Sequence, residues 1–174
     1  MTEKQPFPAV DVARLISRAT ALGVTIATAE SCTGGMVAAA LTDIPGSSAV
    51  LDRGFVTYSN GAKMDMLGVR PETLASYGAV SEEVAAQMSE GALKQAKVSL
   101  AVSITGIAGP GGSEHKPEGR VCFGLAQQGQ AVFTETIEFG ALGRDRVRAA
   151  SCSHALRLLQ QAISQMEQKS GSAR

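Results

Sequence analysis

Apolar positions follow two periods along this chain, and the alternation between the periods predicts interleaved helices and strands. Residues 10–22 carry apolar side chains at helical spacing and are followed by Gly23, a residue that commonly ends helices. Residues 24–29 and 98–105 are short apolar runs typical of buried strands. The same criteria predict further helices over 35–42, 59–67, from Pro71, over 81–97 and over 145–166, and further strands over 50–59, 120–127 and 131–139.

Helices interleaved with apolar strands predict an α/β fold with three layers, α/β/α, in which helices cover both faces of the sheet. The dipeptide Gln128-Gly129 between two strands is a hairpin signal, so the predicted sheet is mixed but mostly parallel. A chain of 174 residues suffices for one well-buried core, and no repeat or linker interrupts it. We therefore expect a single domain over residues 1–174, with 1–8 and 168–174 frayed.

Composition narrows the class of protein. No apolar run is long enough to cross a bilayer and no basic-then-apolar leader begins the chain, which predicts a cytoplasmic protein with no membrane partner. The formal net charge is zero, aromatic residues make up only 4%, and no Lys/Arg cluster is interleaved with them. Nucleic acid is therefore not expected as the main partner.

Cysteine and histidine are few and scattered. Cys32, Cys122 and Cys152 form no C-x-x-C pair, and their odd number does not suggest a disulfide framework. His115 and His154 lie far apart, with no second metal-type residue at ligand spacing beside either. We expect reduced thiols and no metal site.

A polar connection joins the first predicted strand to the helix that follows it. It reads Glu30-Ser31-Cys32-Thr33-Gly34-Gly35. At such a junction the first N–H groups of the helix are unpaired and can receive an anion or an oxyanion, and the two glycines let a ligand approach the backbone. Ser31 is thus a candidate nucleophile. The alternative is that Ser31 or Thr33 merely caps the helix.

A serine hydroxyl needs a base within hydrogen-bond reach, and a lysine is the candidate here. No histidine lies near a predicted strand end, unless His115 swings in. Lys63 follows Tyr58 just past a strand, and a lysine acts as a base when desolvation or nearby cations keep it neutral. Tyr58 could relay the proton or hold the lysine. The alternative is a solvated lysine and a tyrosine ring in the core.

A second conspicuous loop follows the strand predicted over 98–105. It contains Thr105, Gly106, Gly109, Gly111 and Gly112. The backbone N–H groups of this loop could bind a phosphate, or the glycines could serve a tight turn. Their spacing fits neither G-x-x-x-x-G-K-[ST] nor G-x-G-x-x-G, so an ordinary NTPase or dinucleotide-binding fold is not supported. Residues 113–116 match S-x-x-K, but Pro117 and the preceding glycines prevent the helix that motif requires.

Three charged side chains could serve the same ligand. Arg144 and Arg148 are spaced i, i+4 at the start of the last helix and could clamp a phosphate or carboxylate, or be ordinary solvated charges. Glu30 could orient the substrate or the lysine, or pair with an arginine. The loops at Ser31, Tyr58 to Lys63 and Thr105 each follow a predicted strand, so we expect them to converge at one edge of the sheet.

Several ordered blocks of the sequence resemble the CinA C-terminal domain family, whose members include nicotinamide-nucleotide amidases. The similarity runs from about Ala9 into the last helix. The blocks are Ala29 to Gly35, Pro45 to Ser48, Thr57 to Asn60 with Lys63, Leu67 to Val69, Gly78 to Ser81, Thr105 to Gly112, and Lys116-Pro117 with Gly119.

The resemblance implies an amidohydrolase that converts nicotinamide mononucleotide, a small pyridine nucleotide, to nicotinic acid mononucleotide and ammonia without a metal or organic cofactor. It implies Ser31 as nucleophile, Lys63 as its base and Tyr58 as a relay or positioning group. It also implies that the substrate is bound by Thr105, Gly106, Gly109, Gly111, Gly112, Arg144 and Arg148. From the serine connection itself we further expect Glu30, Thr33, Gly34 and Gly35 to bind the substrate.

Two other functions stay open. Names in this family refer to competence and DNA damage, so the chain could be a non-catalytic module that binds a nucleotide or a partner. It could also be an amidase for another pyridine or small amide. Met64 and Met66 hint at a homo-oligomer, although core packing explains methionines equally well.

Overall fold

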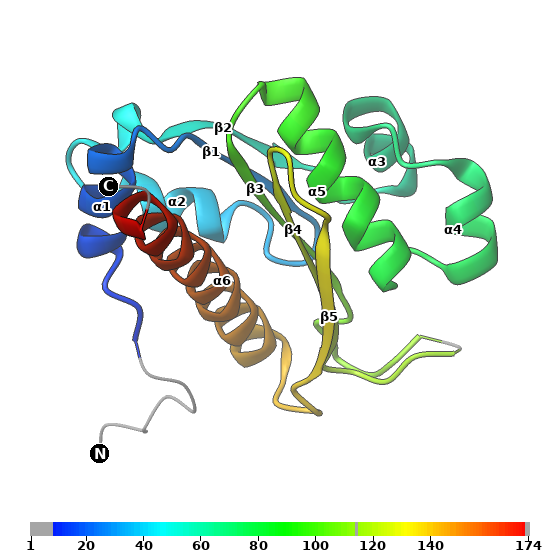
Figure 1. The fold of residues 1–174 in the computed structure, drawn as a ribbon. Helices are drawn as coiled ribbons and strands as arrows, with labels where there is room; N and C mark the ends of the chain where they lie inside the picture. Colours follow the sequence, from blue (N-terminus) through cyan, green and yellow to red (C-terminus); the bar gives the residue numbers. More distant parts are fainter. Residues whose placement is uncertain (1–8, 114, 173–174) are drawn as a thin grey trace, which may run out of the picture.

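The computed structural model describes residues 9–113 and 115–172, and within them five strands form one mixed sheet (Figure 1). The strand order is β2-β1-β3-β4-β5; β2, β1 and β3 run parallel, whereas β4 and β5 pair antiparallel. The strands are Ile26–Glu30 (β1), Leu51–Val56 (β2), Leu100–Gly106 (β3), Arg120–Gln127 (β4) and Phe133–Glu138 (β5). The predicted mixed sheet is confirmed.

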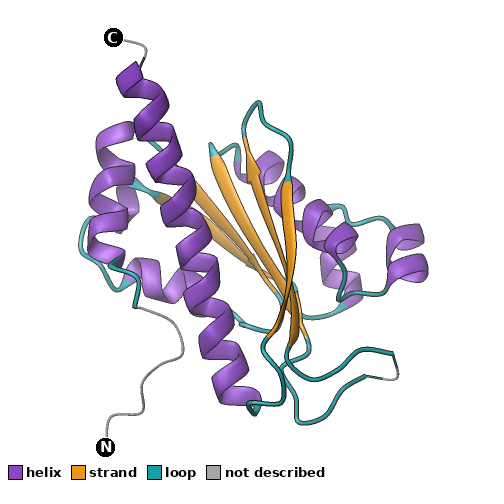
Figure 2. Ribbon diagram, turned by 60° about the horizontal axis from the view of Figure 1, so that its bottom comes forward, coloured by secondary structure: helices purple, strands orange, loops and turns teal. Residues whose placement is uncertain are grey.

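Helices cover both faces of this sheet, as the sequence predicts (Figure 2). On one face lie α1, α2 and α6, and on the other lie α3, α4 and α5. The helices are Val12–Leu22 (α1), Met36–Thr42 (α2), Asn60–Leu67 (α3), Pro71–Tyr77 (α4), Glu82–Ala96 (α5) and Arg144–Ser172 (α6), with a short 3-10 turn at Ser47–Ala49 (η1).

Local sequence signals set where these helices begin and end. The carboxylate of Asp11 accepts a hydrogen bond from the N–H of Arg14 at the start of α1, and Gly23 ends that helix in a left-handed conformation. The hydroxyl of Ser81 caps α5 by accepting from the N–H of Val84. Gly23 and Ser81 therefore end and begin their helices as predicted, whereas neither Ser31 nor Thr33 caps α2.

The last helix is longer than predicted. Helix α6 continues past Met166 to Ser172, so residues 168–172, which we expected to be frayed, are helical. Ser172 remains compatible with the helix because its hydroxyl donates to the carbonyl of Gln168 one turn earlier. Glu167 also forms an ion pair with Arg18 of α1, which fixes this end of α6. The expected fraying of 1–8 and 173–174 lies outside the described residues.

The parallel strands end together, which places three loops at one edge of the sheet. Glu30, the last residue of β1, pairs in register with Val56 of β2 and with Ile104 of β3. Strand β1 lies between the other two and all five of its residues are buried. The convergence predicted from the sequence is therefore present, and β1 delivers Ser31 to its centre.

Two candidate features of other protein classes are not found in the described part of the chain. None of its helices combines the length and apolar character needed to span a membrane. Among the same residues, no three His, Cys, Asp or Glu side chains gather as a metal site would require.

Candidate active site

Ser31 is the first residue beyond β1, and backbone hydrogen bonds fix the turn that carries it. Its N–H donates to the carbonyl of Ile104 at 2.9 Å, and its own carbonyl accepts from the N–H of Gly34 at 3.0 Å. Gly35 caps α2 with a φ of 104°, a conformation that favours glycine. Ser31 is only 8% exposed, so its hydroxyl lies in a buried, fixed position.

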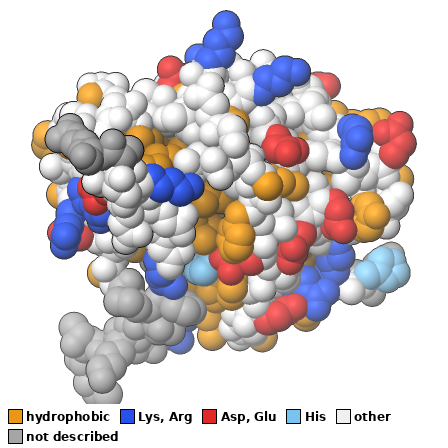
Figure 3. Space-filling view, in the orientation of Figure 1, with side chains coloured by type: hydrophobic (Ala, Val, Ile, Leu, Met, Phe, Trp, Pro, Cys, Tyr) orange, Lys and Arg blue, Asp and Glu red, His pale blue; other side chains and the backbone are white. Residues whose placement is uncertain are grey.

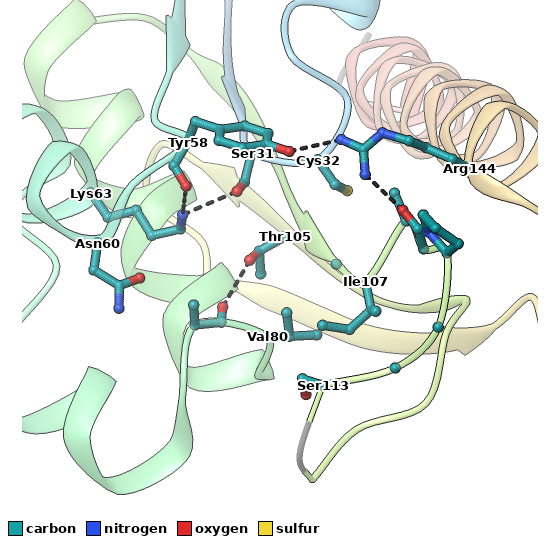
Figure 4. A pocket seen from close by; sticks show the side chains of 17 residues that line it. Ser31, Cys32, Tyr58, Asn60, Lys63, Val80, Thr105, Ile107, Ser113 and Arg144 are labelled. Carbon is teal, nitrogen blue, oxygen red and sulfur yellow. Dashed lines mark hydrogen bonds between the residues drawn. The ribbon is translucent and has the colours of Figure 1, made fainter.

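Lys63 lies opposite Ser31, as the sequence predicts (Figure 4). It projects from α3, whose start is capped by the hydroxyl of Ser59. The lysine Nζ lies 3.0 Å from Ser31 Oγ and 2.8 Å from the carbonyl oxygen of Thr57. Lys63 is 1% exposed, which rules out the alternative of a solvated surface lysine.

Burial also determines the protonation of the groups beside Ser31. It lowers the pKa of the Lys63 amine from its ordinary value, because a buried ammonium loses its hydration. Burial raises the pKa of the neighbouring Cys32 thiol to about 11, which keeps Cys32 protonated at neutral pH. The lowered pKa favours the neutral amine that general-base catalysis requires, whereas a protonated thiol is a poor nucleophile.

Tyr58 contributes to the site through two different atoms. Its side chain is 62% exposed, so the alternative of a ring in the core is wrong. Its hydroxyl accepts a hydrogen bond from Arg144 Nη2 at 2.8 Å. It is the backbone carbonyl of Tyr58 that faces Lys63, at 3.4 Å from Nζ. Tyr58 therefore helps to hold the lysine by its main chain, while its phenol belongs to the outer part of the site.

A cavity of about 350 Å³ opens next to Ser31 and Lys63. Much of its wall is the predicted glycine-rich loop, including Thr105, Gly106, Gly109, Gly111 and Gly112. The hydroxyl of Thr105 donates to the carbonyl of Ala79 at 2.8 Å and so joins the loop to the segment between α4 and α5. The N–H of Gly111 donates to a carboxylate oxygen of Glu118. His115 is exposed and is not among the residues that line the cavity.

The two arginines at the start of α6 do not form a joint clamp. Arg144 lines the cavity and donates to the carbonyl of Gly109 and to the hydroxyl of Tyr58, each at 2.8 Å. Arg148 lies behind the serine turn, where it donates to the carbonyls of Cys32 and Thr33 at 3.0 and 3.4 Å. The predicted ligand contact of Arg148 is thus replaced by a contact with the backbone that carries Ser31.

The remaining predicted ligand contacts lie outside the cavity wall. Glu30 is fully buried, and its carboxylate accepts from the N–H groups of Val37 and Ala38 at 2.9 and 3.1 Å. It neither orients the lysine nor pairs with an arginine in the structure; it caps α2, because the helix start offers it two unpaired donors. Thr33, Gly34 and Gly35 belong to the same turn and do not line the cavity either.

Several lining residues were not selected from the sequence. Asn60, Ala79, Val80, Ile107 and Ser113 all line the cavity. Part of the sequence could have identified them. Asn60 follows Tyr58-Ser59, and residues 78–81 form one of the blocks that resemble the CinA C-terminal domain family. Nothing in the pattern of the sequence brings the connection between α4 and α5 to this edge of the sheet.

Comparisons with known proteins identify the family of this chain and agree with its fold. The family model described as CinA C-terminal domain matches residues 11–163. The chain is 55% identical over 143 residues to nicotinamide-nucleotide amidohydrolase PncC of Escherichia coli strain K12, covering 81% of this chain and 86% of that protein. It is 60% identical over 129 residues to a CinA-like protein of Chlorobium phaeobacteroides strain BS1, of which the match spans only 30%.

Solved structures show the same architecture. The competence/damage inducible protein CihA of Agrobacterium tumefaciens superposes with a TM-score of 0.82 at 48% identity, covering 91% of this chain and 98% of the other. A CinA superfamily protein from Escherichia coli superposes with a TM-score of 0.83 at 36% identity, covering 90% and 94% of the two chains.

Proposed function

Since this chain belongs to the CinA C-terminal domain family, we propose that it is a nicotinamide-nucleotide amidase, which hydrolyses the carboxamide of nicotinamide mononucleotide to nicotinic acid mononucleotide and ammonia. The observation that carries the proposal is the buried pair formed by Ser31 and Lys63, whose reacting atoms lie 3.0 Å apart beside the cavity. The 55% identity to an amidohydrolase of that name supports the choice of substrate.

The hydrogen bonds of Lys63 favour its role as the base. A neutral amine has two N–H bonds and one lone pair. In the structure Nζ donates to Ser31 Oγ and to the carbonyls of Thr57 and Tyr58, at 3.0, 2.8 and 3.4 Å. Once the amine is neutral, the two carbonyls can keep its two N–H groups, which leaves the lone pair for the hydroxyl of Ser31. Lys63 can therefore remove the hydroxyl proton as the serine oxygen attacks the amide carbon.

The remaining steps follow from the same groups. Cys32 lines the cavity and directly follows the nucleophile, so we assign its N–H as the donor to the oxyanion of the tetrahedral intermediate. The protonated Lys63 then gives its proton to the leaving nitrogen, which departs as ammonia and leaves a nicotinoyl ester on Ser31. Water, deprotonated by Lys63, hydrolyses that ester and releases the carboxylate product.

The exposed part of the cavity suits the phosphate of the substrate. Arg144 is a permanent cation there, and its two hydrogen bonds leave further N–H groups for a ligand. The N–H groups of Gly109 and Gly112 have no acceptor within the described residues. A cavity of about 350 Å³ lies in the range of small-molecule sites. We assign phosphate recognition to Arg144 and this loop.

Partners and location follow as further parts of the proposal. Basic and acidic side chains are interspersed on the face that Figure 3 shows, which fits a small-molecule substrate better than a nucleic-acid backbone. We keep a homo-oligomer and a cytoplasmic location as predictions; Met66 is 42% exposed, whereas Met64 is half-buried.

Ammonia release from nicotinamide mononucleotide by the purified protein tests the proposal. We expect turnover with nicotinamide mononucleotide, much less with nicotinamide, which lacks the phosphate, and trapping of the acyl group as a hydroxamate when hydroxylamine is present. Binding of nicotinamide mononucleotide without ammonia release would instead support a non-catalytic nucleotide-binding module. Faster release from another amide would support an amidase of different specificity.

A further inference from the structure

A carboxylate outside the cavity wall joins the two parts of the proposed phosphate site. One oxygen of Glu118 accepts from the N–H of Gly111 at 2.7 Å, and the other accepts from the N–H of Gly143 at 3.1 Å. Gly111 lines the cavity, and Gly143 directly precedes Arg144, which lines it too. Glu118 itself is not among the lining residues.

Packing fixes this carboxylate against the loop. A Cβ placed on Gly109 would lie 2.5 Å from Glu118 Cδ and from Oε1, so the carboxylate lies directly against the Gly109 backbone. The backbone next to Glu118 is also held, because the N–H of Gly119 donates to the carbonyl of Ile107 at 2.8 Å. Glu118 is therefore fixed in position, and it contacts Gly111 in the loop and Gly143, the residue before α6.

We propose that Glu118 is a positioning residue that sets the distance between the glycine-rich loop and Arg144, and thereby the affinity of the site for the anionic group of the substrate. This inference rests on the proposed amidase activity. Arg144 also donates to the carbonyl of Gly109, so the loop and the start of α6 are joined twice. One connection is this arginine, and the other is the carboxylate of Glu118, which accepts from Gly111 and from Gly143. Ser31 and Lys63 belong to other elements, and neither bonds to Glu118.

The variant Glu118→Gln tests the role with little change in shape. A glutamine keeps one acceptor oxygen, but its NH₂ group cannot accept, so either Gly111 or Gly143 loses its partner. We expect KM for nicotinamide mononucleotide to rise about tenfold with kcat within about twofold of the wild type, the size expected for losing one hydrogen bond to a charged group. Glu138→Gln is the matched control, because Glu138 pairs with Arg120 on the neighbouring strand and touches no lining residue named here.

A second measurement does not depend on turnover. Amide exchange by NMR should become faster at Gly111 or Gly143 in Glu118→Gln and should stay unchanged at both in Glu138→Gln. The unfolding midpoint of each variant separates positioning from stability, since a merely structural role would lower the midpoint and leave the KM of the folded enzyme unchanged.

The outcomes separate this inference from the proposed function. Wild-type KM and wild-type exchange in Glu118→Gln would overturn the role of Glu118, and so would a loss confined to kcat. A wild-type protein that releases no ammonia would contradict the amidase alone; the dissociation constant of nicotinamide mononucleotide and the two exchange rates would then decide whether Glu118 positions the site.

Discussion

The cavity has a reacting side and a rim, and the two are built in opposite ways. On the reacting side, Ser31 is 8% exposed and Lys63 is 1% exposed, and both are held by backbone groups at the ends of parallel strands. On the rim, Tyr58 is 62% exposed and Arg144 is exposed, and both are held by hydrogen bonds between the start of α6 and two loops. Burial therefore shifts the pKa values of Lys63 and Cys32 on the reacting side, whereas the rim keeps an exposed arginine that a ligand can reach.

Ser31→Ala should give the largest effect, because it removes the only atom proposed to form a bond with the substrate. We expect kcat to fall at least about 10³-fold, the scale on which nucleophile deletions act. Ser48→Ala removes the same hydroxyl from an exposed turn and should keep wild-type turnover. Near-normal kcat in a folded Ser31→Ala protein would contradict the nucleophile assignment.

Lys63→Met should follow, with kcat reduced by about 10²- to 10⁴-fold through loss of the general base. In the wild type the neutral amine is the active form, so kcat should rise with pH as Lys63 loses its proton through its lowered pKa. The residual activity of Lys63→Met should lack that rise. An identical pH profile in the two proteins would exclude Lys63 as the titrating group.

The same pKa shift predicts how stability depends on pH. The folded pKa of Lys63 lies below the value of about 10.4 in an unfolded chain. Between the two values the unfolded state holds a proton that the native state has released, so the free energy of unfolding rises with pH across that window. Urea midpoints of the wild type minus those of Lys63→Met should therefore increase toward alkaline pH.

Glu30→Gln should cost about 2 kcal/mol of stability, because a buried carboxylate that accepts two helix N–H groups is replaced by a weaker acceptor. This variant tests whether Glu30 supports the fold of the reacting side without contacting the substrate. The KM of the folded fraction should stay close to the wild-type value, and Glu90→Gln, on an exposed position of α5, should leave the unfolding midpoint unchanged. A raised KM would restore Glu30 to the substrate site.

Arg144→Met should have the smallest effect of the four, a rise in KM of about tenfold with little change in kcat. Arg148→Met is its informative partner, because Arg148 holds the carbonyls of Cys32 and Thr33 rather than the rim. That variant should lower kcat and stability instead of raising KM. Equal KM effects from both substitutions would mean that the division between rim and reacting side is wrong.

The sequence predicted most of the fold because the deciding signals are local. Gly23 and Ser81 mark helix boundaries through their own backbone or side-chain chemistry, and the apolar runs of β1 and β3 need no distant partner to be recognised. Ser31 and Lys63 could be paired because each follows a strand, and the ends of parallel strands meet.

The rest of the site depends on geometry that no local pattern contains. The spacing of Arg144 and Arg148 puts them on one face of α6. Because that helix packs against the serine turn, Arg148 contacts the turn and only Arg144 reaches the cavity. All residues of β1 are buried, so no alternation of burial indicated where the Glu30 carboxylate points. Strand β2 ends at Val56, earlier than predicted, so the exposed Tyr58 lies in the loop that follows it.

The backbone around Ser31 is joined to strands on both sides, since its N–H donates to Ile104 and the carbonyl of Glu30 accepts from Thr57. Neither bond involves residues 107–113. Substitutions or insertions in that loop can therefore leave the position of Ser31 unchanged. Relatives with this fold can therefore differ in the amide that they bind and still share the same reaction.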